Sequence, residues 1–352
     1  MKTIMVAPLN WGLGHATRCI PIIHALKEQN FKVVIASDGA ALTLLQKEFP
    51  DLESIELPSY RVKYPSHGLF FKWKMLSSIP RIYNTMIAEK KLIAKLVTQG
   101  KIDGIISDSR PGTRNIKVPS AYITHQLKVK TGSTTFLSSK MHQKIIKKFD
   151  VCWVPDVEAP VTNLSGRLGH IEKPSFPVEY LGVLSRMKKT PQPHSIDILA
   201  LISGPEPQRT YFEEILKTKL QNSKKKVLMV RGVIEEEQKW TKHGNIRIVN
   251  FMQSSELEET INKSELIISR SGYTTLLDLT ILDKKVFFVP TPGQYEQEYL
   301  AKRLKRLGIA PYCPQNKFKV EKLNDAVVYQ GLKPFKQPLV DFSKLFSLFQ
   351  GK

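Results

Sequence analysis

TIMVAPLNWGLGHATR, residues 3–18, contains a short apolar run, a turn with two glycines and the start of a helical pattern. A second apolar run follows at residues 31–37, after helical spacing over residues 15–29. Apolar strands that alternate with helices predict a parallel sheet covered on both faces. Glycines let the chain turn tightly and approach a ligand, and the first amides of a helix can bind anions. The stretch therefore predicts an α/β domain with a binding loop after its first strand.

The same alternation starts again after residues 188–194, a basic stretch with two prolines. The sequence thus predicts two doubly wound, Rossmann-like domains whose strand ends face a cleft. We expect the first domain over residues 1–185 and the second over residues 186–330. An aromatic-rich stretch at residues 340–350 predicts a closing helix. The strands expected in the second domain are residues 196–202, 226–230, 246–250, 265–269 and 285–290.

Charge is unevenly distributed along the 352 residues, whose formal net charge is +21. Residues 1–150 have an excess of 13 basic side chains, residues 151–300 have no excess, and residues 301–352 have an excess of 8. Nucleic acid, an anionic membrane surface or an acidic substrate would balance such a chain. Three distant cysteines suit a reducing cytoplasm and predict no disulfide framework. Without an Asp-x-Asp motif or a His/Cys cluster, we expect no metal ion and no cofactor.

Three polar residues of the first half are candidates for a general base. His15 lies on the first turn of a helix, where the positive dipole end favours a neutral imidazole. A neutral imidazole that faces a cleft can accept a proton near pH 7. Asp108 ends one predicted strand and His125 follows another. Any of the three could instead position a substrate.

LIISRSGYTTLLD, residues 266–278, predicts a strand, a turn of small residues and the start of a helix. Ser271, Gly272 and the following amides could hold a diphosphate. Asp278 lies roughly 9 Å further at 1.5 Å per residue, within reach of a ribose attached to that diphosphate. An ordinary capped helix with Asp278 in solvent would have a similar sequence.

Three motifs together resemble those of a GT-B glycosyltransferase of family 28. They are GLGH at residues 12–15, SRSG at residues 269–272 followed by Asp278, and PGQYEQE at residues 292–298. That family includes the enzyme that adds N-acetylglucosamine to the lipid-linked peptidoglycan precursor, and it is related to the diacylglycerol glycosyltransferases. The resemblance implies an acceptor-binding first domain, a donor-binding second domain, and a segment at residues 331–352 that packs back on the first domain.

The resemblance also implies roles for individual residues. His15 matches the histidine of the family's glycine loop, with Gly12, Gly14 and Arg18 on the same acceptor-side loop. Asp278 matches the residue that binds the ribose of the nucleotide. The residues expected to bind the donor are Ser203, Gly204, Phe251, Met252, Arg270, Ser271, Gly272, Asp278, Gln294, Gln297 and Glu298, with Phe251 and Met252 at the nucleobase and Gln297 and Glu298 at the sugar.

Two features depart from the family pattern. Pro205 and Pro207 remove amides from the donor loop at residues 203–208, so fewer backbone donors remain there for phosphate. Glu298 stands where the family has the second of two glutamines, which argues for a different donor sugar or a different hydrogen-bond pattern.

The function implied by the resemblance is inverting, metal-independent transfer of a sugar from a nucleotide-sugar, expected to be a UDP-sugar, to a lipid-linked or membrane-associated acceptor. A nucleotide-sugar hydrolase or epimerase of the same fold is an alternative, because such hydrolases share the G-x-G-H-x-x-R turn of residues 12–18. A nucleic-acid-binding protein would also explain the charge, but it predicts a basic, aromatic-rich recognition module. We find no such module in the sequence.

A membrane surface accounts for the charge better than nucleic acid does. Residues 60–95 carry eight basic side chains and one acidic side chain, interleaved with apolar ones. Residues 127–149 add six lysines, with Met141, Ile145, Ile146 and Phe149 spaced as one helical face. Such a mixture suits an anionic lipid surface, although a core with a solvated lysine face would look alike. We expect a cell-envelope protein at the inner face of the cytoplasmic membrane, docked through Phe70, Phe71, Lys72, Trp73 and Lys74.

Overall fold

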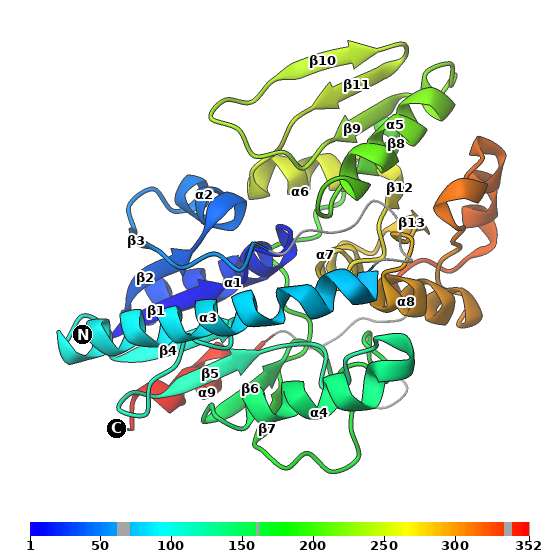
Figure 1. The fold of residues 1–352 in the computed structure, drawn as a ribbon. Coiled ribbons are helices and arrows are strands. Elements are labelled where there is room, and N and C mark those ends of the chain that lie inside the picture. The colour runs from blue at the N-terminus through cyan, green and yellow to red at the C-terminus, as the bar shows by residue number, and fades with distance from the viewer. Residues whose placement is uncertain (62–70, 160–161, 334–339, 352) are drawn as a thin grey trace. The chain divides into compact units, whose positions relative to one another are not determined.

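The computed structural model describes residues 1–61, 71–159, 162–333 and 340–351, and of residues 71–78 only the helical backbone (Figure 1). The chain divides into two compact units. The first contains Met1–Val62, Met75–Leu184 and Gln337–Lys352, and the main segment of the second is Ser185–Lys336. Each unit has its own sheet with helices around it. The two-sheet α/β architecture predicted from the sequence is confirmed.

The first unit contains a seven-stranded parallel sheet in the order β3-β2-β1-β4-β5-β6-β7. The order reverses between β1 and β4, which pair side by side. Ligands of doubly wound sheets bind at such a reversal, outside the carboxyl ends of the strands. The strands are β1 Thr3–Pro8, β2 Lys32–Ser37, β3 Glu53–Glu56, β4 Gly104–Asp108, β5 Ser120–Ile123, β6 Val151–Val154 and β7 Val178–Tyr180.

The helices of the first unit bury the apolar faces that the sequence predicts. Ile20, Ile23 and Leu26 of the first helix are all buried. Two aromatic residues of the last described segment also pack in this core. Phe346 and Phe349 are fully buried against Trp153 of β6. The helices are α1 Gly14–Glu28, α2 Gly39–Glu48, α3 Phe71–Thr98, α4 Thr135–Ile146 and α9 Phe342–Phe346, the last followed by a 3-10 turn at Ser347–Phe349.

The second unit repeats this plan with a six-stranded sheet in the order β10-β11-β9-β8-β12-β13. All neighbouring strands are parallel except β10, which pairs antiparallel with β11. The strand order reverses between β8 and β12. The strands are β8 Ile196–Leu201, β9 Val227–Val230, β10 Trp240–His243, β11 Ile246–Val249, β12 Ser264–Ser269 and β13 Lys285–Phe288. The helices are α5 Gln208–Leu220, α6 Ser254–Asn262, α7 Tyr273–Ile281 and α8 Tyr295–Arg306.

Four strands, β3, β6, β7 and β10, lie outside the strands that the sequence predicts. β6 is a buried run of only four residues, and β7 consists of three half-buried residues. β10 is exposed along its whole length, and β3 is exposed or half-buried. Neither therefore contains the buried apolar run that identifies the central strands. Within the described part of the chain, no helix has the length and apolar character needed to cross a membrane.

Candidate functional site

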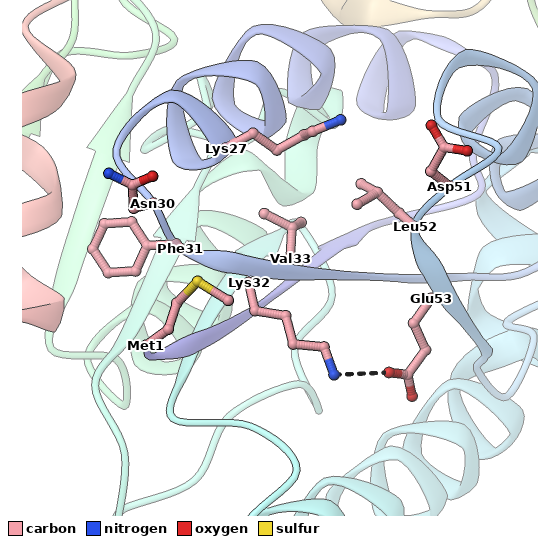
Figure 2. A pocket seen from close by; sticks show the side chains of 9 residues that line it. All are labelled: Met1, Lys27, Asn30, Phe31, Lys32, Val33, Asp51, Leu52 and Glu53. Carbon is pink, nitrogen blue, oxygen red and sulfur yellow. Dashed lines mark ion pairs between the residues drawn. The ribbon is translucent and has the colours of Figure 1, made fainter.

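A shallow hollow of about 290 Å³ lies at the amino ends of β1, β2 and β3 (Figure 2). Lys32 and Glu53 approach each other to 3.5 Å there, and both side chains are about half exposed. None of the predicted site residues lines this hollow. It lies at the edge of the sheet opposite the carboxyl ends, so it is not the site that the topology indicates.

His15 and Asp108 meet at the β1/β4 reversal of the first sheet. His15 lies on the first turn of α1, and Asp108 is the last residue of β4, opposite Pro8 of β1 in the register. Nδ1 of His15 lies 2.7 Å from Oδ1 of Asp108. The carboxylate is fully buried, whereas 19% of the His15 side chain is exposed. The imidazole is thus anchored through Nδ1 with one side toward solvent.

Arg18 and His125 complete this cluster. Arg18 lies one turn after His15 on α1 and donates through Nε and Nη2 to both carboxylate oxygens of Asp108. Its Nη1 lies 3.1 Å from Nδ1 of His125, which follows β5. The sequence predicts His15, Asp108 and His125 as separate candidates, and the structure gathers them around one arginine. Arg18 itself is buried and lies on α1, one turn after the glycine loop.

The charges of the cluster are balanced between Arg18 and Asp108. Burial alone would raise the pKa of Asp108, but Arg18 and His15 outweigh it and hold this pKa well below its usual range. Burial lowers the pKa of His15, Asp108 opposes that shift, and Arg18 adds to it. Asp108 is therefore ionised and His15 is neutral near pH 7. The turn before His15 needs glycine at position 12, whose φ is +81°.

A second buried network holds the loops around this edge of the sheet. Arg110 donates from Nε to Glu89 of α3 at 2.6 Å and from Nη1 to Asp38 at 2.7 Å. The hydroxyl of Tyr60 and the amide of Gly112 donate to the other oxygen of Glu89. Sequence reasoning missed this network, because nothing in the spacing of these residues distinguishes them from surface charges.

The start of α7, which follows β12 at the reversal of the second sheet, is a candidate anion site. Gly272 is its N-cap, and no side chain among the described residues caps it. The amides of a first helical turn have no partner within the helix and favour an anion. Ser271 is buried, and its hydroxyl donates to the main-chain oxygen of Gln297 at 2.8 Å. Oε1 of Gln297 in turn accepts from the amide of Thr291 at 2.8 Å. These two hydrogen bonds connect α8 to the loop after β12 and to the loop after β13.

Arg270 does not reach the surface and cannot contact a diphosphate directly, contrary to the sequence-based expectation. Its guanidinium is fully buried, lies 4.0 Å from the Phe212 ring, and donates to the carbonyl oxygens of Val289 and Gln208 and to Gln315 Oε1. Burial lowers its pKa to about 9. Arg270 is therefore part of the core beneath the β8 and β13 loops.

The loop that follows β8 contains a carboxylate, that of Glu206, close to the start of α5. Ser203 and Gly204 are half-buried, but the carboxylate of Glu206 accepts from the hydroxyl of Thr210 at 2.8 Å and from Nε of Arg209 at 2.7 Å. Burial acts to raise the pKa of Glu206, and these hydrogen bonds lower it overall. The first turn of α5 is thus occupied by a carboxylate, which disfavours phosphate at this loop.

Four other residues are expected from the sequence to bind the donor: Phe251, Met252, Gln294 and Glu298. Phe251 and Met252 follow β11 and are both buried. Gln294 is the N-cap of α8, and Glu298 accepts from the amide of Gly293 at 3.1 Å.

Asp278 is half-buried on α7, and Ser185 donates to its Oδ1 at 2.6 Å. Burial raises the pKa of Asp278 against the opposing effects of Arg186 and Ser185. Oδ1 thus accepts from Ser185, and Arg186 acts on the same carboxylate through its charge.

The structure does not test the five residues predicted to dock on a membrane. Phe70 and the side chains of Phe71, Lys72, Trp73 and Lys74 lie outside the described residues. In the other segment, Ile146 and Phe149 are buried core residues and not an exposed face. The exposed apolar residues of α4 are Phe136, Leu137 and Met141.

Comparisons with known proteins agree with this architecture. Residues 202–337 match the model of the glycosyltransferase family 28 C-terminal domain. An uncharacterized glycosyltransferase of Methanosarcina acetivorans is 23% identical over 318 residues, which cover 84% of this chain and 81% of that protein. Another, from Methanopyrus kandleri, is 21% identical over 321 residues, which cover 86% of this chain and 89% of that protein.

Two solved structures of low identity share the fold. The glycosyltransferase SnogD from Streptomyces nogalater has a TM-score of 0.60 at 12% identity and covers 99% of both chains. MurG from Acinetobacter baumannii has a TM-score of 0.56 at 13% identity and covers 100% of both chains. The chain is a glycosyltransferase with the GT-B fold, and its residues 202–337 match the family 28 C-terminal domain.

Proposed function

We propose that this glycosyltransferase moves a sugar from a nucleotide-sugar to an acceptor hydroxyl with inversion at the anomeric carbon, and that His15 is the base. The observation that carries the proposal is the 2.7 Å contact between His15 Nδ1 and the buried carboxylate of Asp108. An ionised carboxylate accepts the Nδ1 proton, which leaves the lone pair on Nε2. Nε2 can then take a proton from the acceptor, and Asp108 stabilises the imidazolium that forms.

In the proposed step the acceptor oxygen forms a bond to the anomeric carbon from the face opposite the leaving group. Its proton passes to Nε2 of His15, and the bond from the anomeric carbon to the diphosphate breaks. Attack from the opposite face inverts the configuration at this carbon. The nucleoside diphosphate leaves with the bonding electrons, so the site must stabilise a growing negative charge.

The start of α7 is the group proposed to stabilise that charge, without a metal ion or other cofactor. Its first-turn amides favour an anion, whereas Glu206 disfavours phosphate at α5. Oδ2 of Asp278 would bind a ribose hydroxyl, and Gln294 and Glu298 would bind the sugar. UDP-sugars are the first donors to test, because the resemblance to family 28 points to them.

The base assignment is tested with His15→Ala, with His24→Ala as the matched control on the exposed side of the same helix. Thermal shift with UDP-, GDP- and TDP-sugars first identifies a donor, and release of nucleoside diphosphate then measures turnover. We expect His15→Ala to lower kcat by about 10²–10⁴-fold with donor affinity retained, and His24→Ala to match the wild type. Undiminished turnover in His15→Ala would remove His15 from the role. Full-rate release without any acceptor would instead identify a nucleotide-sugar hydrolase.

We further propose that the acceptor is lipid-linked and that the chain docks on the inner face of the cytoplasmic membrane through α4. Phe136, Leu137 and Met141 are 80%, 59% and 54% exposed. Lys140 and Lys144 are exposed on the same helix, and Lys147 and Lys148 just beyond it. Exposed apolar side chains beside lysines combine lipid insertion with attraction to anionic headgroups.

Co-sedimentation with phosphatidylglycerol/phosphatidylcholine vesicles tests the docking. The triple serine variant of Phe136, Leu137 and Met141 should lose binding. The control replaces Val327 and Val328 by serine, since both are well exposed in the second unit. Equal binding by the triple variant and the wild type would exclude α4 as the docking surface.

A further inference from the structure

Arg18 contacts three side chains, those of Asp108, His15 and His125. It is buried, and its Nε and Nη2 donate to the two oxygens of Asp108. Its Nη1 lies 3.1 Å from Nδ1 of His125, and its Nη2 lies 2.9 Å from Nδ1 of His15. One guanidinium therefore contacts the carboxylate and both imidazoles.

The chemistry of arginine restricts the protons of both histidines. A guanidinium has five N–H donors and no acceptor. Nδ1 of His125 must therefore accept from Arg18, so a neutral His125 carries its proton on Nε2. His15 differs, because its Nδ1 also faces Oδ1 of Asp108, the carboxylate oxygen at 2.7 Å. The ionised oxygen accepts from Nδ1 of His15 and from Arg18 together, so Nε2 of His15 carries the lone pair.

We propose that Arg18 is a positioning residue that fixes opposite tautomers on the two histidines and keeps His15 unprotonated at neutral pH. This inference rests on the proposed role of His15 as base. The charged and titratable groups that face His15 are Arg18 on its own helix, Asp108 at the end of β4, and His125 after β5. Because Arg18 shares the carboxylate of Asp108, this carboxylate compensates a proton on His15 only in part. A His–Asp pair without the arginine would hold that proton more tightly.

The pKa of His15 is consistent with this arrangement. Burial lowers it, Asp108 raises it, and both Arg18 and His125 lower it further. A purely structural arginine that only ties α1 to β4 would make the same contacts with Asp108. It would have no effect on the tautomer of His125.

The test is a ¹⁵N-histidine NMR titration of the free protein, with signals assigned from His15→Gln and His125→Gln. In the wild type near pH 7, we expect His15 protonated on Nδ1 and His125 on Nε2. In Arg18→Met the pKa of His15 should rise by about 1–3 units, and His125 should lose its single tautomer. Lys27→Met removes an exposed charge nine positions further along α1, roughly 13 Å away, and should change neither signal.

Arg18→Lys separates the charge from the geometry. Lysine keeps the positive charge but has one nitrogen, so it cannot serve Asp108 and His125 together. We expect the pKa of His15 to stay within about half a unit of the wild type, while His125 loses its fixed tautomer. If Arg18→Met does not fold, the wild-type tautomers and Arg18→Lys decide the question.

Two results would overturn the inference. One is a wild-type His125 protonated on Nδ1, and the other is a folded Arg18→Met whose His15 titrates as in the wild type. Both are measured without substrate, so they are independent of turnover in His15→Ala. Where turnover can be followed, the acid limb of the kcat/KM profile should move to higher pH in Arg18→Met.

Discussion

Arg110→Met should destabilise the first unit, because it leaves buried carboxylates without their cation. The guanidinium is fully buried, pairs with Glu89 at 2.6 Å and Asp38 at 2.7 Å, and donates to the carbonyl oxygen of Pro58 at 2.7 Å. Methionine fills most of the volume but donates no hydrogen bond. Breaking a buried pair from one side costs about 3–5 kcal/mol, so we expect the free energy of unfolding of this unit to fall by that amount.

Differential scanning calorimetry measures this loss. At roughly 2–4 °C per kcal/mol for a unit of this size, the melting temperature of the first unit should fall by roughly 6–20 °C. Adding Glu89→Gln to Arg110→Met removes one of the stranded charges and should recover part of the loss. Lys91→Met, at an exposed position of α3, controls for the loss of a positive charge.

The pH dependence gives a second readout with a defined sign. Burial raises the pKa of Glu89, and Arg110 and Tyr60 oppose that shift. An acid whose pKa is raised on folding stabilises the folded state below its unfolded pKa and loses that contribution as pH rises through the folded pKa. Without Arg110 the folded pKa of Glu89 rises further, so the deficit of Arg110→Met should be larger near about pH 8 than near about pH 5. A deficit below about 1 kcal/mol, or one that grows toward acid, would refute the reasoning.

Three further predictions concern packing and charge. Gly104→Ala should cost about 1–3 kcal/mol in denaturant unfolding, because its Cβ would lie 2.5 Å from Phe349 Cδ1; the loss should shrink in the Phe349→Ala background. Arg270→Met should cost the second unit about 1–3 kcal/mol in the same assay, since it strands carbonyl and amide oxygens and no described carboxylate. Glu206→Gln should tighten donor binding roughly twofold to tenfold by calorimetric titration, while the exposed Glu214→Gln should not.

The sequence predicts the central strands except β6, and it indicates the edge of each sheet at which a ligand is expected. His15 and His125 follow recognisable strands and Asp108 ends one, and parallel strands bring their carboxyl ends to one edge. Pro8 and Asp108 are partners in the β1/β4 register, and this pairing makes the contact of Asp108 with His15 possible. That register depends on the whole sheet, so the sequence shows three candidates and not one cluster.

Side-chain direction is the part that the motifs do not determine. Arg270 lies within the SRSG motif, yet it points into the core, where the Phe212 ring and carbonyl oxygens receive it. The helical face proposed for residues 127–149 fails for a similar reason. α4 ends at Ile146, so Phe149 lies beyond the helix and packs in the core, while Met141 faces solvent.

The two buried arginines of the first unit are paired with carboxylates, unlike the exposed lysines that contribute to the net charge of +21. Arg18 is neutralised by Asp108, and Arg110 is neutralised by Asp38 and Glu89. Buried pairs of this kind are screened little by salt, whereas exposed lysines such as those of α4 are screened within about 10 Å at 0.1 M. The exposed charge can thus attract an anionic surface, and added salt should weaken that attraction much more than it weakens the buried pairs around the base.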